Sequence, residues 1–287
     1  MPKPAVIVVN SHVVRGSVGG RSSVFALERM GFPVWALTTV SLAWHPGHGR
    51  STRVAPDDAA FAAAVGDLAG APGLGEVAAI LVGYLGSEAQ VEPLARLVET
   101  LKRRNPAILF LYDPDIGDGD TFFQPASLAA AARDKLLPLA DISTPNRFEL
   151  GWLTGGVLRS EDEAASAAAK LGPPEVVVTS ATVSPNEIGM VLFTDGAVQI
   201  ARQAAVAASP KGTGDLFAAL YLGHRLDGRA PAAALQRAAA AVARLAEQAV
   251  ALQVDELPLA SGQDAFAAAP TGITVKPWAG ARGKRPA

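Results

Sequence analysis

The sequence predicts an α/β fold in which a central, mostly parallel β-sheet is flanked by helices on both faces. From residue 5 to residue 179, short β-branched runs alternate with Ala- and Leu-rich amphipathic stretches. This alternation is typical of parallel strands joined by crossover helices. The runs at 5–9 and 175–179 are continuously apolar, as expected of strands that are buried on both faces.

The expected elements can be placed in order along the chain. Strands are predicted at 5–9, 34–40, 78–82, 107–112, 141–143 and 175–179. The intervening helices are predicted near 19–30, 57–68, 88–104, 125–137 and 161–171. After residue 179 the pattern changes, because the runs 188–194 and 197–202 flank Asp195-Gly196, a strong hairpin signal. Two helices are then expected, at 213–226 and at 232–252, of which the second is rich in alanine.

Neither a repeat nor a clear linker divides the 287 residues. We therefore expect one α/β domain over residues 1–260. The remaining stretch, 261–287, is rich in Gly and Pro and is expected to be a partly ordered C-terminal extension.

Composition narrows the class of protein. Hydrophobic residues make up 49% of the chain, which is enough for a large core. The net charge is −2 without a basic stripe or an acidic block, so we expect no nucleic-acid partner. The chain has no cysteine, which excludes disulfides and thiolate metal sites. The apolar run 5–9 is too short for a signal peptide or a membrane span, so we expect a cytoplasmic protein with no membrane partner.

The segment K-G-T-G-D-L-F at 211–217 carries the strongest chemical signal. Gly212, Thr213 and Gly214 precede Asp215 where a helix is predicted to begin. Glycines allow a tight turn that points several N–H groups at one spot, and the helix N-terminus adds partial positive charge. Such a turn favours an anion such as a phosphoryl group, and the helix dipole favours the ionised form of Asp215. The alternative is an ordinary turn in which Asp215 caps the helix.

Carboxylates gather after the predicted strand 107–112. Asp113, Asp115 and Asp118 lie at its carboxyl end, where open α/β sheets bind ligands. Carboxylate oxygens there are suited to Mg²⁺ and the phosphates that accompany it. The alternative is a solvated acidic turn.

A third polar segment follows the predicted strand 141–143. Thr144, Asn146 and Glu149 lie at this strand end, and the last two share one helical face because they are three residues apart. The alternative is a capped helix start, with Glu149 in the first turn.

These segments together resemble those of ribokinase-like kinases. The succession D-P-x-x-G-D, A-D-I-x-T-P-N-x-x-E and G-T-G-D-L-F-A-A occurs in that family's order. The segment 10–19, which reads N-S-H-V-V-R-G-S-V-G, resembles the opening of pyridoxal kinases. The segment 83–87, G-Y-L-G-S, resembles their second substrate-side motif. The resemblance extends from residue 5 to about residue 252.

The resemblance implies a ribokinase-like fold and an activity. Pyridoxal kinases transfer a phosphoryl group from ATP, with Mg²⁺, to the 5′-hydroxymethyl group of pyridoxal, and pyridoxine and pyridoxamine are further candidate substrates. The family often uses a monovalent cation such as K⁺ and usually forms homodimers. The expected partners are therefore ATP, pyridoxal and a second copy of the chain.

The resemblance also assigns roles to individual residues. It implies that Asp215 is the catalytic base and that Gly212, Thr213 and Gly214 form the anion hole. The implied Mg²⁺ residues are Asp113 and Glu149. The implied ATP residues are Asp113, Thr144, Asn146, Glu149, Thr179, Ser180 and Thr213, and the segment 180–187 is implied to be a flap over the nucleotide. The implied substrate residues are Ser11, Val18, His45, Tyr84 and Asp215.

The chain departs from the family pattern in two places. Pro46 replaces a threonine that usually lies near the substrate, and proline has neither an N–H nor a hydroxyl group. The vitamer preference is therefore open, and His45 with His48 can alternatively be a turn pair. Asp115 stands where the family prefers an apolar residue, so it should raise a neighbouring pKa or attract a cation.

Two alternative functions remain. One is another ribokinase-like kinase, acting on hydroxymethylpyrimidine or a sugar. The opening motif argues against sugars, and hydroxymethylpyrimidine kinases often carry cysteine where this chain has Asp215. The other is a catalytically weak vitamin B6-binding protein, against which the intact Asp113, Glu149 and Asp215 argue.

Overall fold

The computed structural model describes residues 2–119, 121–184, 186–207 and 209–278. Its main sheet has ten strands in the order β12-β11-β10-β9-β8-β5-β4-β1-β2-β3. The central strands, from β2 to β9, pair in parallel, and the strands outside them pair antiparallel. The prediction of a mostly parallel sheet with an antiparallel hairpin is confirmed. The strands are β1 Ala5–Arg15, β2 Val34–Trp44, β3 Arg53–Val54, β4 Val77–Val82, β5 Leu109–Tyr112, β8 Ile142–Ser143, β9 Glu175–Ser184, β10 Glu187–Thr194, β11 Ala197–Ala204 and β12 Thr274–Pro277.

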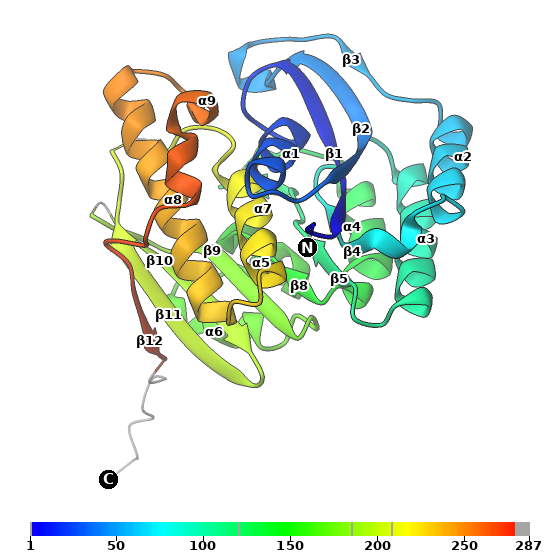
Figure 1. Ribbon diagram of the computed structural model, residues 1–287. Helices are drawn as coiled ribbons and strands as arrows, with labels where there is room; N and C mark the ends of the chain where they lie inside the picture. The colour runs from blue at the N-terminus through cyan, green and yellow to red at the C-terminus, as the bar shows by residue number, and fades with distance from the viewer. Residues whose placement is uncertain (1, 120, 185, 208, 279–287) are drawn as a thin grey trace.

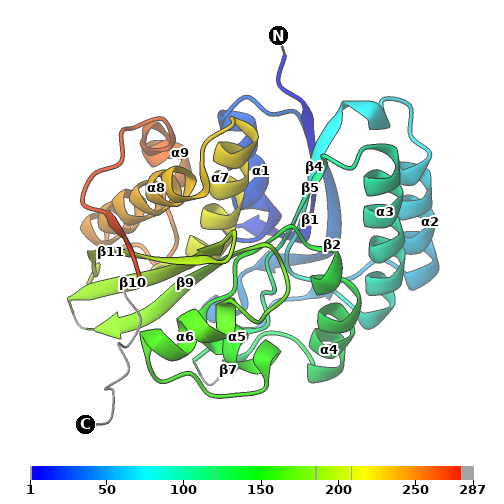
Figure 2. The ribbon, with the colours of Figure 1, turned by 90° about the horizontal axis from the view of Figure 1, so that it is seen from below.

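Helices cover both faces of this sheet (Figures 1 and 2). One face is covered by α1 Gly20–Arg29, α7 Thr213–Leu226, α8 Pro231–Leu252 and α9 Leu259–Gly262. The other is covered by α2 Asp58–Ala69, α3 Val91–Arg104, α4 Ala126–Lys135, α5 Arg147–Thr154 and α6 Glu161–Ala168. Short 3₁₀ helices are η1 Pro46–His48, η2 Leu74–Glu76, η3 Glu88–Gln90, η4 Leu137–Leu139 and η5 Gln263–Phe266.

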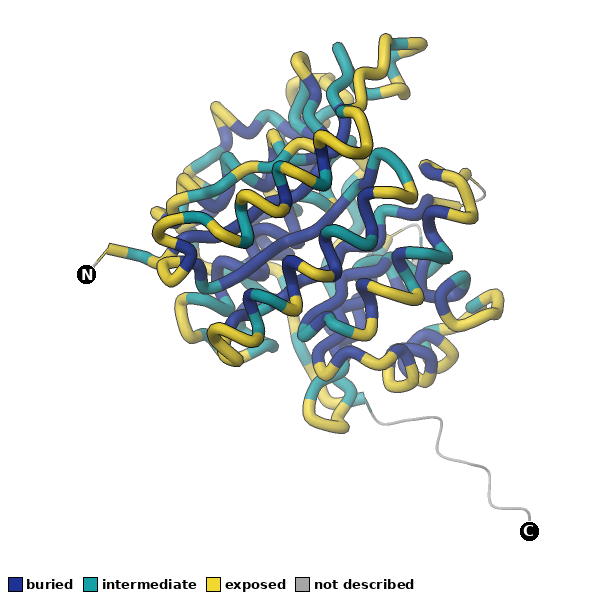
Figure 3. The backbone as a smooth tube through the Cα atoms, turned by 90° about the vertical axis from the view of Figure 1, so that its right-hand side faces the viewer, coloured by how far each residue is buried: buried dark blue, intermediate teal, exposed yellow. Residues whose placement is uncertain are grey.

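Strand β1 shows how the sheet divides the core into two layers. Val6 and Val8 pack with the α7–α8 layer, whereas Ile7 and Val9 pack with the α3–α4 layer. All four are at most 1% exposed, which is why this segment is continuously apolar. Figure 3 shows the same pattern, with buried backbone through the centre and exposed backbone at the periphery.

Strands β1, β2 and β9 are longer than their apolar runs predict. Strand β1 continues through Asn10, Ser11 and His12, because its backbone stays paired with β2 after the side chains turn polar. Strand β9 likewise extends to Ser184 and pairs with β10. Most of the segment 180–187 is therefore a strand hairpin, and Pro185 lies outside the described residues. A second small hairpin, β6 Gly117–Asp118 with β7 Thr121–Phe122, was not predicted.

The described part of the C-terminal stretch packs against the domain. Strand β12 pairs antiparallel with β11 at the sheet edge, and Phe266 of η5 is buried in the α7–α8 layer. Helix α9 crosses residue 260, the predicted domain boundary, and that division remains a prediction. Residues 279–287 of the predicted extension lie outside the described residues. Among the described helices, none combines the length and the apolar character that crossing a membrane requires.

Candidate active site

The candidate site is organised around Asn10, which lies in β1 beside the carboxyl end of β4. Its amide nitrogen donates to Asp215 Oδ1 at 3.1 Å. Its amide oxygen accepts from the backbone N–H of Ser11 at 2.7 Å and of Tyr84 at 3.1 Å. Asn10 is 3% exposed. One buried amide therefore joins the predicted catalytic base to two predicted substrate residues.

Asp215 lies in the first turn of α7, after the glycine-containing turn. Gly212 is the N-cap, in the left-handed conformation with φ 89°, and no side chain caps this end. The interpretation of Asp215 as the helix cap is therefore wrong. Its Oδ2 instead accepts the backbone N–H of Gly19 at 2.8 Å. The first amides of α7, at Thr213 and Gly214, have no acceptor within the helix, and their role as an anion hole remains a prediction.

Asp113 lies directly after β5 and faces the neighbouring strand end. Thr144, which follows β8, donates its hydroxyl to Asp113 Oδ1 at 3.0 Å. The exposed fractions are 9% for Asp113 and 3% for Thr144. The structure thus brings together these two residues from separate motifs, as expected for adjacent parallel strands.

Glu149 belongs to a capping box at the start of α5. Asn146 Oδ1 accepts the Glu149 N–H, and Glu149 Oε2 accepts the Asn146 N–H, both at 2.9 Å. Glu149 Oε1 also accepts the N–H of Ile116 at 2.8 Å, and the Asn146 amide donates to the Gly117 carbonyl at 2.7 Å. The helix-cap interpretation is confirmed, and the same carboxylate ties α5 to the acidic segment after β5.

Asp115 adds a further carboxylate to this region, with an unusual backbone. Its φ is 46°, in the left-handed region that Asp tolerates better than most residues. Burial, followed by the charges of Asp215 and Asp113, raises the pKa of Asp115 well above its usual range. Besides burial, Asp115 in turn raises the pKa of Glu149, which is the direction predicted for an extra carboxylate among these acids.

The remaining acids are perturbed in the same direction. Burial, then Glu149 and Asp215, raise the pKa of Asp113 well above its usual range. Burial raises the pKa of Glu149 to about 8, against the hydrogen bonds that it accepts. Burial also raises the pKa of Asp215, although Gly19 and Asn10 act in the opposite direction. The helix dipole was expected to favour the ionised form of Asp215, whereas burial shifts its pKa in the opposite direction.

The predicted substrate residues lie around Asn10 and Gly19. Ser11 is 8% exposed and Val18 is 6% exposed. Tyr84 is half-buried, and its hydroxyl donates to the Phe123 carbonyl at 3.1 Å. Arg53 donates to the same hydroxyl at 3.0 Å, which fixes the ring from a third segment.

His45 takes the turn role that was the alternative interpretation. It is the N-cap of η1, and its Nδ1 accepts the N–H of Gly47 at 3.0 Å. Burial and the charge of Lys211 lower the pKa of the His45 ring, which favours the neutral form that accepts. Pro46 occupies the first position of η1, where a missing N–H costs nothing.

Thr179 and Ser180 lie inside β9 rather than at a strand end. The N–H of Thr179 donates to the Pro145 carbonyl at 3.0 Å, so β9 runs beside the Thr144–Asn146 segment. Both residues are half-buried. Their predicted place on the nucleotide side remains a prediction.

No complete metal site is preformed in the described ranges. Within residues 2–119, 121–184, 186–207 and 209–278, no group of three or more His, Asp or Glu side chains is arranged to hold a metal ion. The acids that were predicted to help with Mg²⁺, Asp113 and Glu149, interact electrostatically across a buried region. Such a pair fits a hard cation that keeps most of its own water and phosphate ligands.

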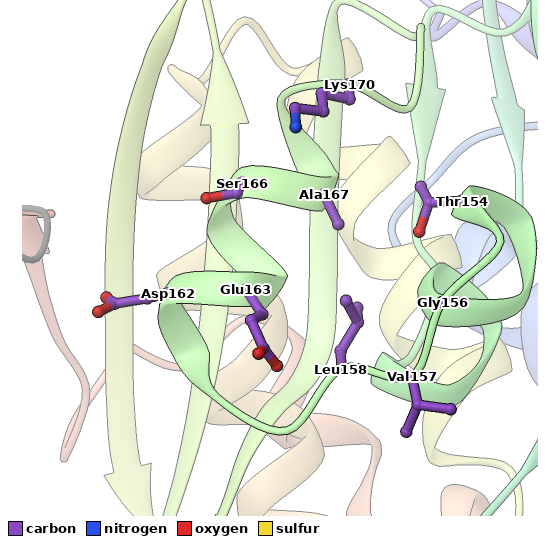
Figure 4. A pocket seen from close by; sticks show the side chains of 9 residues that line it. All are labelled: Thr154, Gly156, Val157, Leu158, Asp162, Glu163, Ser166, Ala167 and Lys170. Atoms are coloured by element: carbon purple, nitrogen blue, oxygen red, sulfur yellow. The ribbon is translucent and has the colours of Figure 1, made fainter.

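Two cavities lie elsewhere. One, of about 440 Å³, is lined by Thr154, Gly156, Val157, Leu158, Asp162, Glu163, Ser166, Ala167 and Lys170 (Figure 4). It lies at the end of α5 opposite to Asn146. The other, of about 530 Å³, is lined by Arg50, Ser51, Thr52 and Arg53. Neither contains a predicted site residue, so polar contacts rather than cavity volume define the candidate site.

Sequence reasoning assigned no role to Asn10, to the Gly19 amide or to Arg53. For Asn10 a signal existed, because it is the first polar residue after the apolar run 5–9. The contacts of Gly19 and Arg53 depend on how distant segments meet, so no local pattern marks them.

Similarity to known proteins agrees with this geometry. Residues 74–260 match the phosphomethylpyrimidine kinase family. The pyridoxal kinase PdxY of Granulibacter bethesdensis is 36% identical over 248 residues, covering 83% of this chain and 87% of that protein. The pyridoxine/pyridoxal/pyridoxamine kinase of Bordetella avium is 37% identical over 253 residues, covering 86% and 84%.

Solved structures support the fold. The pyridoxal kinase from Leishmania donovani, in complex with ADP and pyridoxamine, superposes with a TM-score of 0.88 at 26% identity and covers 96% of this chain and 100% of that chain. The pyridoxal kinase from Entamoeba histolytica superposes with a TM-score of 0.89 at 22% identity, over 96% and 100%. The predicted ribokinase-like fold is thus confirmed, and the chain belongs to the pyridoxal kinases, within the phosphomethylpyrimidine kinase family.

Proposed function

We propose that this protein transfers the γ-phosphoryl group of ATP to the 5′-hydroxymethyl group of pyridoxal. The observation that carries the proposal is the setting of Asp215. Its carboxylate lies at the start of α7, beside the glycine-containing turn 212–214, which we call the anion-binding turn. Asn10 and Gly19, from the substrate-side segments, donate hydrogen bonds to it. A base in this position would lie between the proposed phosphate site and the proposed alcohol site.

The reaction needs alignment and charge neutralisation rather than a covalent intermediate. The substrate hydroxyl oxygen bonds to the γ-phosphorus, the bond from that phosphorus to the ADP oxygen breaks, and the hydroxyl proton passes to Asp215. The raised pKa of Asp215 makes it a stronger proton acceptor once ionised. The amides of Thr213 and Gly214, together with the dipole of α7, stabilise the transferred oxygens.

Asp113 and Glu149 would hold Mg²⁺, directly or through water. The support is the fit of two buried, mutually repelling carboxylates to a divalent cation. When bound, Mg²⁺ would supply the charge that offsets the phosphate oxygens. A monovalent cation such as K⁺ is proposed for the same acidic region, where Asp115 adds negative charge.

The nucleotide is proposed to lie along the ends of β8 and β9. Thr144 and Asn146 support this placement, because both sit between the acidic segment and β9. Thr179, Ser180 and Thr213 would complete the nucleotide side, and the hairpin of β9 and β10 would cover it. Closure over the nucleotide would exclude water, which otherwise hydrolyses ATP.

The wider setting is also a proposal. We propose that the protein acts as a homodimer in the cytoplasm, in line with the family resemblance. Sedimentation velocity of the purified protein tests whether it is a homodimer, and a single species with the mass of one chain would contradict that proposal.

A coupled ADP-release assay tests the function. The acceptors are pyridoxal, pyridoxine, pyridoxamine, hydroxymethylpyrimidine and ribose, each with Mg²⁺ and with Mg²⁺ removed by chelation. We expect kcat/KM to be highest for the vitamin B6 compounds, and we expect turnover to be lost without Mg²⁺. The match to phosphomethylpyrimidine kinases makes hydroxymethylpyrimidine the second candidate substrate. A preference for hydroxymethylpyrimidine of roughly tenfold, which is the free energy of about one pocket contact, would refute the pyridoxal assignment. It would not refute the assignment as a kinase.

A further inference from the structure

Asp255 and Glu256, which follow α8, contact three segments of the candidate site: the segment at Lys211, the loop 16–19 and η1. Asp255 and Glu256 lie beside Lys211, the residue before the anion-binding turn. The Lys211 N–H donates to the Asp255 carbonyl at 2.8 Å. The Asp255 side chain is 61% exposed, whereas that of Glu256 is only 13% exposed. No step of the proposed reaction uses Glu256, so its near-burial calls for another explanation.

The first loop that Glu256 contacts, 16–19, carries Gly19, whose N–H donates to Asp215. The Ser17 N–H donates to Glu256 Oε2 at 2.5 Å. Val18 and Gly19 follow, and Gly19 is the donor to Asp215 Oδ2 at 2.8 Å. The Glu256 contact is therefore two residues from the contact that orients the base.

Two glycines permit this close arrangement. Gly16 has φ 131°, and a Cβ there would lie 2.5 Å from Glu256 Oε2. A Cβ on Gly212 would lie 2.2 Å from the Ser17 carbonyl oxygen. The loop 16–19 is thus confined between Glu256 on one side and the anion-binding turn on the other.

The second loop is η1, which lies on the substrate side. His48 Nε2 lies 2.6 Å from Glu256 Oε1, and His48 Nδ1 lies 3.2 Å from Asp255 Oδ2. The neighbouring His45 is a predicted substrate residue. The two oxygens of Glu256 therefore contact two separate loops, and each loop carries a predicted substrate residue, Val18 on the first and His45 on the second.

We propose that Glu256 is a positioning residue that fixes the loops 16–19 and 45–48 relative to Asp215. It touches neither substrate nor phosphate, and it acts through the Ser17 N–H and through His48. Misplacement of a reacting group by about 1 Å can cost on the order of a hundredfold in rate. The inference deepens the proposed function and rests on it, because it concerns the pyridoxal side of that site.

The experiment compares Glu256→Ala and Glu256→Gln with Asp264→Asn. Each variant is assayed for kcat and for the KM of pyridoxal and of ATP, and calorimetry measures the Kd of pyridoxal without ATP. Glu256→Ala should lower kcat/KM for pyridoxal by about tenfold or more and weaken pyridoxal binding, while the KM of ATP stays within about threefold. Glu256→Gln keeps an oxygen that accepts the Ser17 N–H, so it should recover most of the loss. Asp264→Asn is the control, because its carboxylate is 97% exposed and lies 3.7 Å from Arg29, outside the loops 16–19 and 45–48, so the variant should behave like the wild type.

Several results would overturn the inference. Wild-type kinetics in Glu256→Ala would do so. So would equal losses of kcat/KM in the Ala and Gln variants, or a parallel rise in the KM of both substrates. Thermal unfolding of all variants shows whether the Ala variant is folded, and the Gln variant keeps the test valid if it is not. A wild-type protein that does not phosphorylate pyridoxal would refute the proposed function, whereas an active wild type with an insensitive Ala variant would refute this inference alone.

Discussion

At the residue scale, the candidate site depends on polar groups that satisfy one another away from solvent. Asn10 has three hydrogen bonds to groups from β1, from the loop after β4 and from α7. Each buried donor that lost its acceptor would cost roughly 1–3 kcal/mol. The geometry of the base is therefore supported by groups that also stabilise the fold.

The first prediction concerns Asp215. The substitution Asp215→Asn removes the group that accepts the hydroxyl proton, so kcat should fall by about 10²–10⁴. The amide keeps one oxygen for Gly19 or Asn10, so the free energy of unfolding should change by only about 1 kcal/mol. The KM of ATP should stay within about threefold, because the Thr213 and Gly214 amides are unchanged. Steady-state kinetics and urea unfolding of the same preparation measure both effects, and a fully active Asn variant would contradict the role of the base.

Residues with a local signal were predictable from the sequence. Glu149 and Asn146 were recognisable because a capping box has a fixed spacing, and Asp113 because it ends an apolar strand. The contact of Gly19 with Asp215 links residues 196 positions apart, and no spacing rule encodes it. The upward shift in the pKa of Asp215 was missed, because desolvation depends on the packing of the whole site.

At the element scale, periodicity identified the long elements and missed the short ones. Strands β4 and β9 begin where apolar β-branched runs begin, and helices α7 and α8 lie close to their predicted ranges. Strands β6 and β7 have two residues each, too few for any alternation to be visible. The polar half of β1 is a strand because β2 pairs with it, which is a tertiary effect.

The second prediction concerns the contact between β9 and α7. Glu175 is 6% exposed and accepts from the Tyr221 hydroxyl at 2.5 Å and from Arg225 Nε at 3.0 Å. Glu175→Ala would leave the arginine charge and the phenol without this acceptor, and should cost about 2–4 kcal/mol of unfolding free energy. The matched control is Glu99→Ala, which removes a surface pair with Arg103 and should cost less than about 1 kcal/mol. Urea unfolding measures both, and equal losses would show that burial does not strengthen the Glu175 contact.

At the scale of the whole molecule, the sheet separates two apolar layers. The candidate site lies where the carboxyl ends of the strands meet the start of α7. This explains why the fold was easier to predict than the site. Alternating strands and helices imply the layers directly, whereas Asp215 and Asp113 come together only once the sheet order is known. The edge strand β12 was not predicted, because four residues in a Gly- and Pro-rich stretch carry no periodic signal.

The last prediction concerns the pH dependence of global stability, which His224 of α7 should influence. Its side chain is buried, and among the described residues neither ring nitrogen has a hydrogen-bond partner. Burial, followed by the charges of Arg229 and Arg237, lowers the pKa of His224 to about 4, while Asp227 acts in the opposite direction and Lys3 adds a small decrease. In the unfolded chain the ring should titrate near its ordinary pKa of 6.5.

Between pH 6.5 and about 4, the unfolded chain therefore binds a proton that the folded protein excludes. The contribution of His224 to stability is fully present above pH 6.5 and is lost progressively as the pH falls through this window. His224→Leu, which keeps an apolar side chain of similar size, should remove this part of the slope. The free energy of unfolding in urea, measured near pH 7.5 and near pH 5, should fall by about 1–2 kcal/mol more in the wild type than in the variant. Equal slopes would mean that the buried ring binds its proton as readily in the folded protein as in the unfolded chain.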